Sequence, residues 1–397
     1  WPEAAMIHGV RIANGTAVTY ANRWVRTRHW ARRFAPEEAE LFPETNPNVN
    51  VIRHGGRDLA LAEGGAPVEL IHGLETGPVP ESLAAGITAH PTLEPETGEL
   101  LWFRSSGAAP YLVYGVSDAA GTVVVEQPIE LPGPAMMHDF AITERFSLFL
   151  DGNVAYDLSL LEKGYRIPIR WFEERRARLG VVPRAGGEVR WFPIAPCFLQ
   201  HVANAYELPA DQAGGERIVF DVIRYETFLR LDEAKVAFLD NPLGQLWRYE
   251  IDMATGTVHE RAVTEANMEM PRINEARTGR RHRYVYGVLQ PTDREMRGVV
   301  KVDVDTGQQW AFVPPVGDQN SEPIFVPDPA RAEAEDGGWL LFCVYRAQTD
   351  TSDLVVLDAQ SVERPPVATV PLPRRIPAGF HGAWMPDRRI RDQRPES

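Results

Sequence analysis

The feature that most constrains the fold is a long series of short strand-like segments with almost no helical periodicity between them. Alternating or apolar runs of four to seven residues, bounded by turn formers, are typical of strands. We predict strands at 101–104, 111–116, 122–126, 146–150, 217–223, 246–251, 257–263, 284–288, 299–304, 309–313, 339–345 and 354–357. Helical patterns are found only at 36–41 and 169–179. The chain is therefore predicted to be all-β.

Similar turn motifs recur between these strands. They read EPETGEL (94–100), DMATGTV (252–258) and DVDTGQQ (303–309), with a looser SDAAGTV at 117–123. Each places an acidic residue or serine before a glycine, which suits a hairpin position that needs a positive φ. Gly256 and Gly307 are 51 positions apart, and a repeat near 50 residues with about four strands is typical of propeller blades. The pattern favours a propeller and leaves a sandwich or mixed barrel as the alternative.

Composition and charge narrow the function classes. The chain has 397 residues, of which 44% are hydrophobic, and a net charge of −14. This composition supports a large core and excludes a disordered chain, while the negative charge opposes binding to phosphate backbones. We therefore expect no nucleic-acid partner. The apolar run at 339–345 is far shorter than the roughly 20 residues that a membrane-spanning helix needs.

Four histidines stand out because apolar or small residues flank them at the ends of strand-like runs. They are His90, His138, His201 and His381, at spacings of 48, 63 and 180 residues. A lone histidine in such a place is more often part of the core. On a propeller, however, these spacings distribute them over different blades whose inner strands converge on the axis, where a ring of imidazoles would bind a metal. Imidazole alone does not choose among zinc, copper, nickel and iron.

Several motifs carry a resemblance to a known family. They are AHPTLEPETGEL, MMHDFAIT with a downstream FLD, MEMPRIN followed by RYVYG, SEPIFVP followed by EDGG, and the terminal GFHGAW. In this order they closely resemble the carotenoid cleavage oxygenases, a family that includes lignostilbene and resveratrol-cleaving dioxygenases. The resemblance extends from residue 6 to His381, nearly the whole chain.

The resemblance implies a seven-bladed β-propeller with Fe(II) on its axis and a cap of loops and short helices over a substrate tunnel. It implies that His90, His138, His201 and His381 bind the iron. It also implies that Glu63, Glu269 and Glu322 hold three of these imidazoles. Carboxylates that accept the outer ring N–H would balance charge and orient each ring.

The expected activity is that of an Fe(II)-dependent dioxygenase that cleaves a carbon–carbon double bond with O₂ and releases two carbonyl products. We expect one propeller domain over residues 1–397, with the N-terminal part of the first blade missing, because family members have further residues before the MIHGVRI segment. The alternative outside the enzyme class is a carotenoid-binding propeller that does no catalysis. Retention of all seven metal-site residues argues against that alternative.

The substrate class depends on Ala62. In the hydroxystilbene-cleaving branch a lysine commonly stands at this position and anchors the phenol oxygen of the substrate. A methyl group would leave that hydroxyl unpaired, at a cost of about 1–3 kcal/mol. We therefore predict a carotenoid or apocarotenoid substrate and keep a stilbenoid as the alternative.

The segment 165–180, YRIPIRWFEERRARLG, raises the question of membrane contact. It places Ile167, Ile169, Trp171 and Phe172 beside several arginines. The first interpretation is a helix packed on the propeller, and the second is a membrane-surface patch around the tunnel mouth. We expect a cytoplasmic protein, and under the second interpretation one that also contacts a membrane surface. We expect no obligate protein partner.

Overall fold

The structure is a computed structural model that describes residues 3–165, 167–209, 215–232, 237–238 and 243–387. The strands are β1 (Met6–Ala13), β2 (Thr16–Trp24), β3 (Asn50–His54), β4 (Arg57–Leu61), β5 (Val68–Ile71), β6 (Glu75–Thr76), β7 (Thr92–Leu93), β8 (Leu100–Ser105), β9 (Leu112–Ser117), β10 (Val123–Ile129), β11 (Ala141–Ile142), β12 (Phe146–Asp151), β13 (Val154–Tyr156), β14 (Ile169–Trp171), β15 (Arg178–Pro183), β16 (Arg190–Pro193), β17 (Phe198–Leu208), β18 (Arg217–Tyr225), β19 (Leu231–Asp232), β20 (Ala237–Phe238), β21 (Gln245–Asp252), β22 (Val258–Arg272), β23 (Tyr284–Leu289), β24 (Val299–Asp303), β25 (Gln309–Phe312), β26 (Gln319–Asn320), β27 (Ile324–Pro327), β28 (Gly338–Arg346), β29 (Thr351–Asp358) and β30 (Ala368–Pro371). The helices are α1 (Arg28–Phe34) and α2 (Ser159–Glu162), with 3-10 turns η1 (Pro36–Leu41), η2 (Glu81–Leu83), η3 (Glu275–Arg277) and η4 (Pro329–Arg331).

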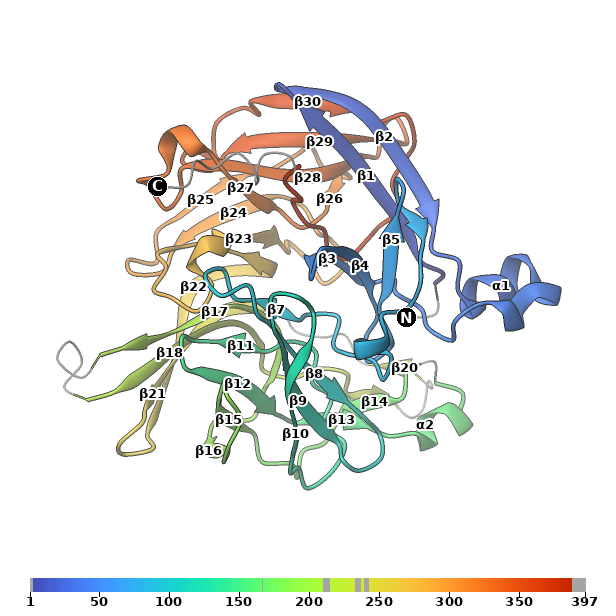
Figure 1. The fold of residues 1–397 in the computed structure, drawn as a ribbon. Helices are drawn as coiled ribbons and strands as arrows, with labels where there is room; N and C mark the ends of the chain where they lie inside the picture. Colours follow the sequence, from blue (N-terminus) through green and yellow to red (C-terminus); the bar gives the residue numbers. More distant parts are fainter. Residues whose placement is uncertain (1–2, 166, 210–214, 233–236, 239–242, 388–397) are drawn as a thin grey trace.

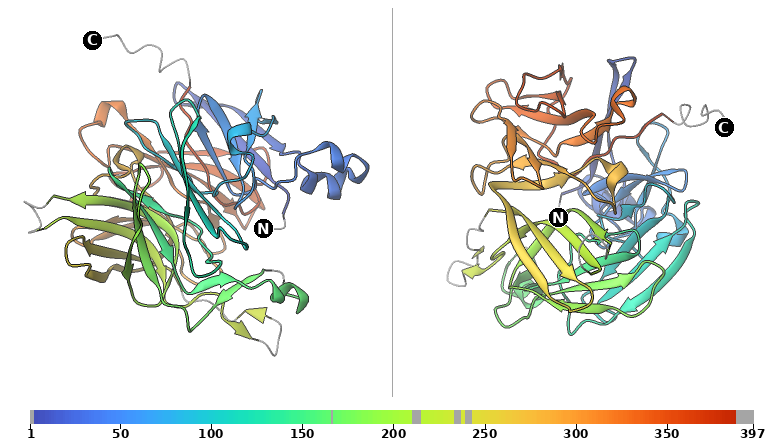
Figure 2. Two further views of the ribbon diagram at one scale, coloured as in Figure 1. Left: turned by 60° about the horizontal axis from the view of Figure 1, so that its bottom comes forward. Right: turned by 90° about the vertical axis from the view of Figure 1, so that its left-hand side faces the viewer.

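The strands form antiparallel sheets of neighbours in sequence. The main sheets have the orders β3-β4-β5-β6, β10-β9-β8-β7, β11-β12-β15-β16, β17-β18-β21-β22-β23-β24-β25 and β26-β28-β29-β30, with β27 also paired to β28. Figure 1 shows these sheets arranged around a common centre, and Figure 2 shows the same arrangement from two further directions. The prediction of an all-β, propeller-like protein is confirmed, and every predicted strand overlaps a strand of the structure.

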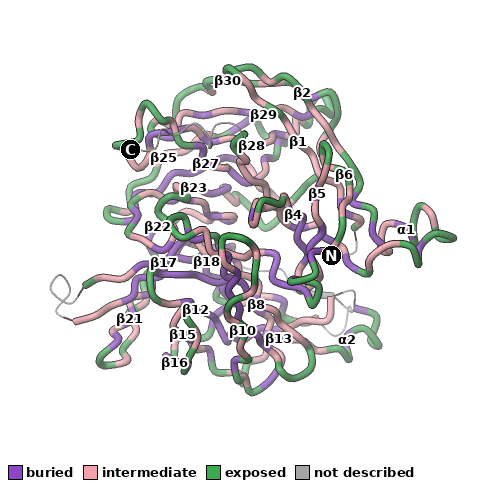
Figure 3. Tube along the Cα trace, viewed as in Figure 1, coloured by how far each residue is buried: buried purple, intermediate pink, exposed green. Residues whose placement is uncertain are grey.

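The core lies between successive sheets. One cluster joins Leu148 of β12 and Leu179 of β15 to Phe220 of β18 and Tyr249 of β21, and all four side chains are buried. Figure 3 shows buried residues concentrated along the inner strands and exposed ones in the peripheral turns. Each sheet thus buries its faces against its neighbours, as the repeat requires.

The turn prediction is also confirmed. Gly98, Gly256 and Gly307 have φ values of 72°, 78° and 76°. In the Gly256 turn, Oδ1 of Asp252 accepts hydrogen bonds from the backbone N–H groups two and three residues later. The acidic residue satisfies the turn backbone while glycine adopts the left-handed conformation.

The predicted helix at 169–179 is wrong. Residues 169–171 form β14, which pairs with β13, and β15 begins at Arg178. The strand pairing buries Trp171 to 5% exposure. Between the strands, Arg175 turns inward to contact Asp151. Tertiary pairing therefore overrides an amphipathic pattern that is too short to sustain a helix alone.

The segment proposed for membrane contact is partly buried. Trp171 is buried, while Ile167, Ile169 and Phe172 are half-buried, and residue 166 lies outside the described residues. Membrane contact by this segment stays a prediction. In the described part of the chain, the structure contains no helix both long and apolar enough to cross a bilayer.

Candidate metal centre

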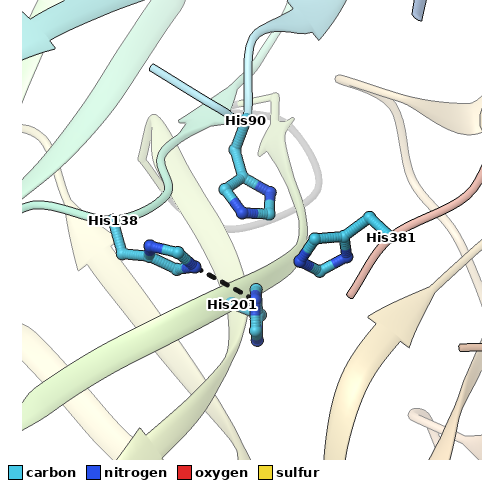
Figure 4. Close-up of side chains that lie close together, drawn as sticks. All are labelled: His90, His138, His201 and His381. Carbon is cyan, nitrogen blue, oxygen red and sulfur yellow. Dashed lines mark hydrogen bonds between the residues drawn. The ribbon is translucent and has the colours of Figure 1, made fainter. Parts of the chain in front are cut away.

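The four histidines singled out in the sequence come together in one cluster. One ring nitrogen from each of His90, His138, His201 and His381 lies within 4.8 Å of the others. Figure 4 shows the four rings converging from separate segments. Nε2 of His138 lies 3.2 Å from Nε2 of His201. Two ligands at right angles around a metal, each at roughly 2.1 Å, are roughly 3.0 Å apart. The spacing therefore suits ligands that share one ion.

Three carboxylates contact the outer nitrogens of three of these rings. Nδ1 of His138 lies 2.7 Å from Oε2 of Glu63. Nδ1 of His201 lies 2.6 Å from Oε2 of Glu269. The remaining pair joins His381 to Glu322 at 3.0 Å. The structure thus brings together all seven residues that the sequence singled out.

The chemistry of this donor set fits a divalent cation. A ring whose Nδ1–H donates to a carboxylate presents an unprotonated Nε2. The pairing of His201 with Glu269 is a hydrogen bond, and His138 makes a close contact of 2.7 Å with Glu63. With a carboxylate at each Nδ1, the two rings would turn Nε2 lone pairs toward each other, and a cation between them would relieve the repulsion. Nε2 of His90 is buried without a hydrogen-bond partner among the described residues. An orphaned buried nitrogen aimed into the cluster is what a metal ligand needs.

Irregular backbone sets the orientation of two side chains of the site, His201 and Glu269. The pairing of β17 with β18 shifts register on both sides of Val202, immediately after His201. The pairing of β22 with β23 shifts between Glu269 and Arg272, and Met270 has a φ of 50°. A bulge rotates a side chain away from the regular alternation of a strand, which is why bulges are common beside functional sites.

Burial and neighbouring charges both shift the pKa values of the ionisable groups of the cluster. Burial, reinforced by the neighbouring histidines, lowers the pKa of His90 well below its usual value. Burial also opposes ionisation of Glu322, but Arg272 and His381 outweigh it and hold the pKa of this carboxyl below its usual range. The carboxylate therefore stays charged beside the cluster.

The sequence analysis missed several residues that support the cluster. The hydroxyl of Tyr225 donates to Oε1 of Glu269 at 2.7 Å. Oδ2 of Asp139 accepts from the backbone N–H of Val202 at 2.8 Å, so the residue after His138 is tied to the residue after His201. Burial raises the pKa of Asp139 to about 6. Asp139 stands inside the MMHDFAIT motif, whereas Tyr225 lies in an ordinary strand sequence without a signal.

Two histidines outside the cluster, His54 and His282, are buried although turn or charged residues flank them in the sequence, a setting that favours the surface. His282 is 1% exposed. Its Nε2 lies 3.1 Å from Oδ2 of Asp221. Its Nδ1 lies 3.1 Å from Nδ2 of Asn204. It belongs to a buried polar network between strands and not to the four-histidine cluster.

The fold and the site together place this chain in one class of protein. Its members are all-β and propeller-like, with a candidate metal centre of four histidines and three glutamates. The family model described as retinal pigment epithelial membrane protein matches residues 3–386. The chain belongs to this family, which is that of the carotenoid cleavage oxygenases.

Relatives of known description agree. A carotenoid cleavage oxygenase of Mycobacterium tuberculosis is 34% identical over 440 residues, covering 96% of this chain and 86% of the relative. The apocarotenoid-15,15'-oxygenase of Synechocystis is 32% identical over 370 residues, covering 85% and 72% of the two chains. The cobalt-substituted Synechocystis enzyme has a similar structure, with a TM-score of 0.84, 27% identity, and coverage of 95% of this chain and 86% of that one. Membership in this family supports an oxygenase enzyme.

Proposed function

We propose that this protein is an Fe(II)-dependent dioxygenase that cleaves one double bond of a carotenoid or apocarotenoid with O₂. Each carbon of the cleaved bond receives one oxygen atom, so that one alkene and one O₂ become two carbonyl compounds. The observation that carries the proposal is the convergence of four imidazoles, three of them on carboxylates, in a member of the carotenoid cleavage oxygenase family.

The proposed iron ligands are His90, His138, His201 and His381. When bound, iron supplies the redox chemistry that O₂ needs, which zinc would not. The protein's own side chains do the rest: Glu63, Glu269 and Glu322 accept the outer ring protons and orient three imidazoles. We also propose that the sheets are seven blades of one propeller domain, with the ion on the axis and the loops and short helices as its cap.

The preference for a polyene rests on the residue before Glu63. Ala62 follows β4 and is 5% exposed. Its methyl group offers no partner to a phenol, whereas apolar contact is all that a polyene needs. The relatives named above are called carotenoid or apocarotenoid oxygenases, which supports the same choice.

The decisive experiment compares an apocarotenal with resveratrol on the iron-loaded, unmodified enzyme. We expect kcat/KM to favour the apocarotenal by at least about tenfold, or about 1.4 kcal/mol in transition-state binding. Products are identified as aldehydes by mass, and the metal-free protein serves as control. A tenfold preference for resveratrol would show that another residue anchors the phenol. Binding of the polyene without products by fully iron-loaded protein would favour the carotenoid-binding alternative.

The carboxylates provide a second prediction. Replacement of Glu63, Glu269 or Glu322 by Gln retains the shape of the side chain but removes its charge. The amide then faces Nδ1–H either with an uncharged oxygen, which is a weaker acceptor, or with an NH₂ group, which cannot accept at all. We expect each variant to bind Fe(II) roughly 10–100-fold more weakly, measured by competition with a chelator. Glu335, whose carboxylate accepts from backbone N–H groups away from the cluster, provides the control Glu335→Gln. Wild-type affinity in all three site variants would exclude the proposed role.

A further inference from the structure

Arg272, at the end of β22, contacts the candidate metal centre from behind one of its carboxylates. Its Nη2 donates to Oε2 of Glu322 at 2.9 Å and to the carbonyl oxygen of Gly382 at 2.8 Å. Its Nε lies 2.8 Å from Oε1 of Glu322. Nη2 therefore bridges a side chain and a backbone group, while Nε of the same planar guanidinium approaches the other carboxylate oxygen, an arrangement that two nitrogens in fixed geometry can provide.

Glu322 also contacts both a side chain and a backbone group, and both belong to the C-terminal segment. Its Oε1 accepts from Nδ1 of His381, and its Oε2 accepts from the backbone N–H of Gly382 at 3.2 Å. The segment that carries His381 has no helix or strand over the described residues 372–387. Hydrogen bonds from other parts of the fold must therefore fix it. Arg272 and Glu322 link it to β22 and to the loop between β26 and β27.

Charge gives Arg272 a second effect. The three carboxylates on the histidines carry −3, and a divalent ion at the four imidazoles supplies only +2. The guanidinium of Arg272 adds positive charge against this excess, which Asp139 and Glu275 near it increase. Its counterpart at Glu269 is the neutral hydroxyl of Tyr225, which orients a carboxylate without changing the charge. A buried charge left uncompensated is costly, so this balance matters both with and without metal.

We propose that Arg272 is a positioning residue for the metal centre: its fork holds Glu322 and Gly382 together and thereby places the imidazole of His381. This inference rests on the proposed function, because it takes the four histidines to be the metal ligands. A purely structural pair would stabilise the fold without affecting the ion. Arg272 also donates to Glu275, but it differs because its other two acceptors, Glu322 and Gly382, contact or adjoin the ligand His381.

A matched structural pair is available for comparison. Arg248 of β21 makes two hydrogen bonds to Asp221 of β18, at 2.8 and 2.7 Å, and both side chains are buried. Among the described residues, this pair contacts Asp305 and His282, which lie outside the four-histidine cluster. Arg248→Gln should therefore lower the stability of the fold and leave the metal centre unchanged.

The test uses metal-free full-length protein titrated with Co(II), whose absorption spectrum reports the number and geometry of its ligands. We expect Arg272→Gln to weaken cobalt binding roughly 10–100-fold and to change the spectrum. Arg272→Lys keeps the charge but has no second nitrogen to face Oε1 of Glu322 as Nε does, so it should recover only part of the affinity. Arg248→Gln should retain the wild-type spectrum and affinity.

A second measurement does not depend on the metal. Chymotrypsin sites at Phe380 and Trp384 flank His381, and we expect metal-free Arg272→Gln to be cut there several-fold faster than the wild type or Arg248→Gln. If wild-type protein binds no cobalt, the proposed function fails, while proteolysis still reports whether Arg272 holds the segment. Wild-type behaviour of Arg272→Gln in both measurements would overturn the proposal. So would complete recovery by Arg272→Lys, since charge alone would then suffice.

Discussion

The double substitution His138→Ala and His201→Ala should abolish iron binding and with it double-bond cleavage. Nε2 of these two rings lie 3.2 Å apart, so the substitutions remove two neighbouring nitrogens of the cluster. Two remaining imidazoles cannot hold Fe(II) against dilution, and we expect affinity to fall by more than the roughly 10–100-fold that loss of an outer contact costs. Metal analysis after gel filtration, together with turnover of an apocarotenal, measures both effects.

The control for this prediction is His259→Ala, which removes an exposed histidine of β22. It should retain wild-type iron content and activity. Circular dichroism checks that the double variant keeps its strands. Full iron occupancy in a folded double variant would place the metal elsewhere and refute the assignment of the centre.

Trp102→Ala should have the largest effect on stability. The indole is 1% exposed, and its Nε1 donates to the hydroxyl of Ser117 at 3.1 Å. The ring lies directly over Gly115 on the neighbouring strand, where an added Cβ would overlap it. Truncation leaves a cavity that the rigid sheet cannot close, so we expect a loss of about 3–5 kcal/mol, a large fraction of a typical folding free energy.

Urea unfolding of the metal-free protein measures this loss as a shift of the midpoint. Val316→Ala is the control, since Val316 is 84% exposed, and it should change stability by no more than about 0.5 kcal/mol. Gly115→Ala should destabilise as well, because its methyl group meets the indole. A midpoint for Trp102→Ala equal to that of the control would mean that the sheet repacks around the missing ring.

The strands and turns could be predicted from the sequence because their signals are local. Short apolar runs define β8, β9 and β12 wherever they lie in space. The turn at Gly256 needs only an acidic residue and a glycine a few positions apart. The segment 169–179 could not be predicted, because its helical pattern competes with a strand partner, β13, that the sequence does not identify. Likewise α1 was missed, although Thr27 caps it by accepting from the backbone N–H of Trp30.

For the candidate site, the sequence by itself determined the residue types: four histidines in apolar surroundings, and three glutamates recognised through the motifs around them. Only the tertiary structure decided which carboxylate meets which imidazole, because Glu63 and His138, like Glu322 and His381, are far apart along the chain. It also decided the roles of Arg272 and Tyr225. Glu269 and Arg272 are placed by a bulge at Met270, and a bulge forms where two strands pair out of register. That register depends on long-range pairing, which no local sequence pattern encodes.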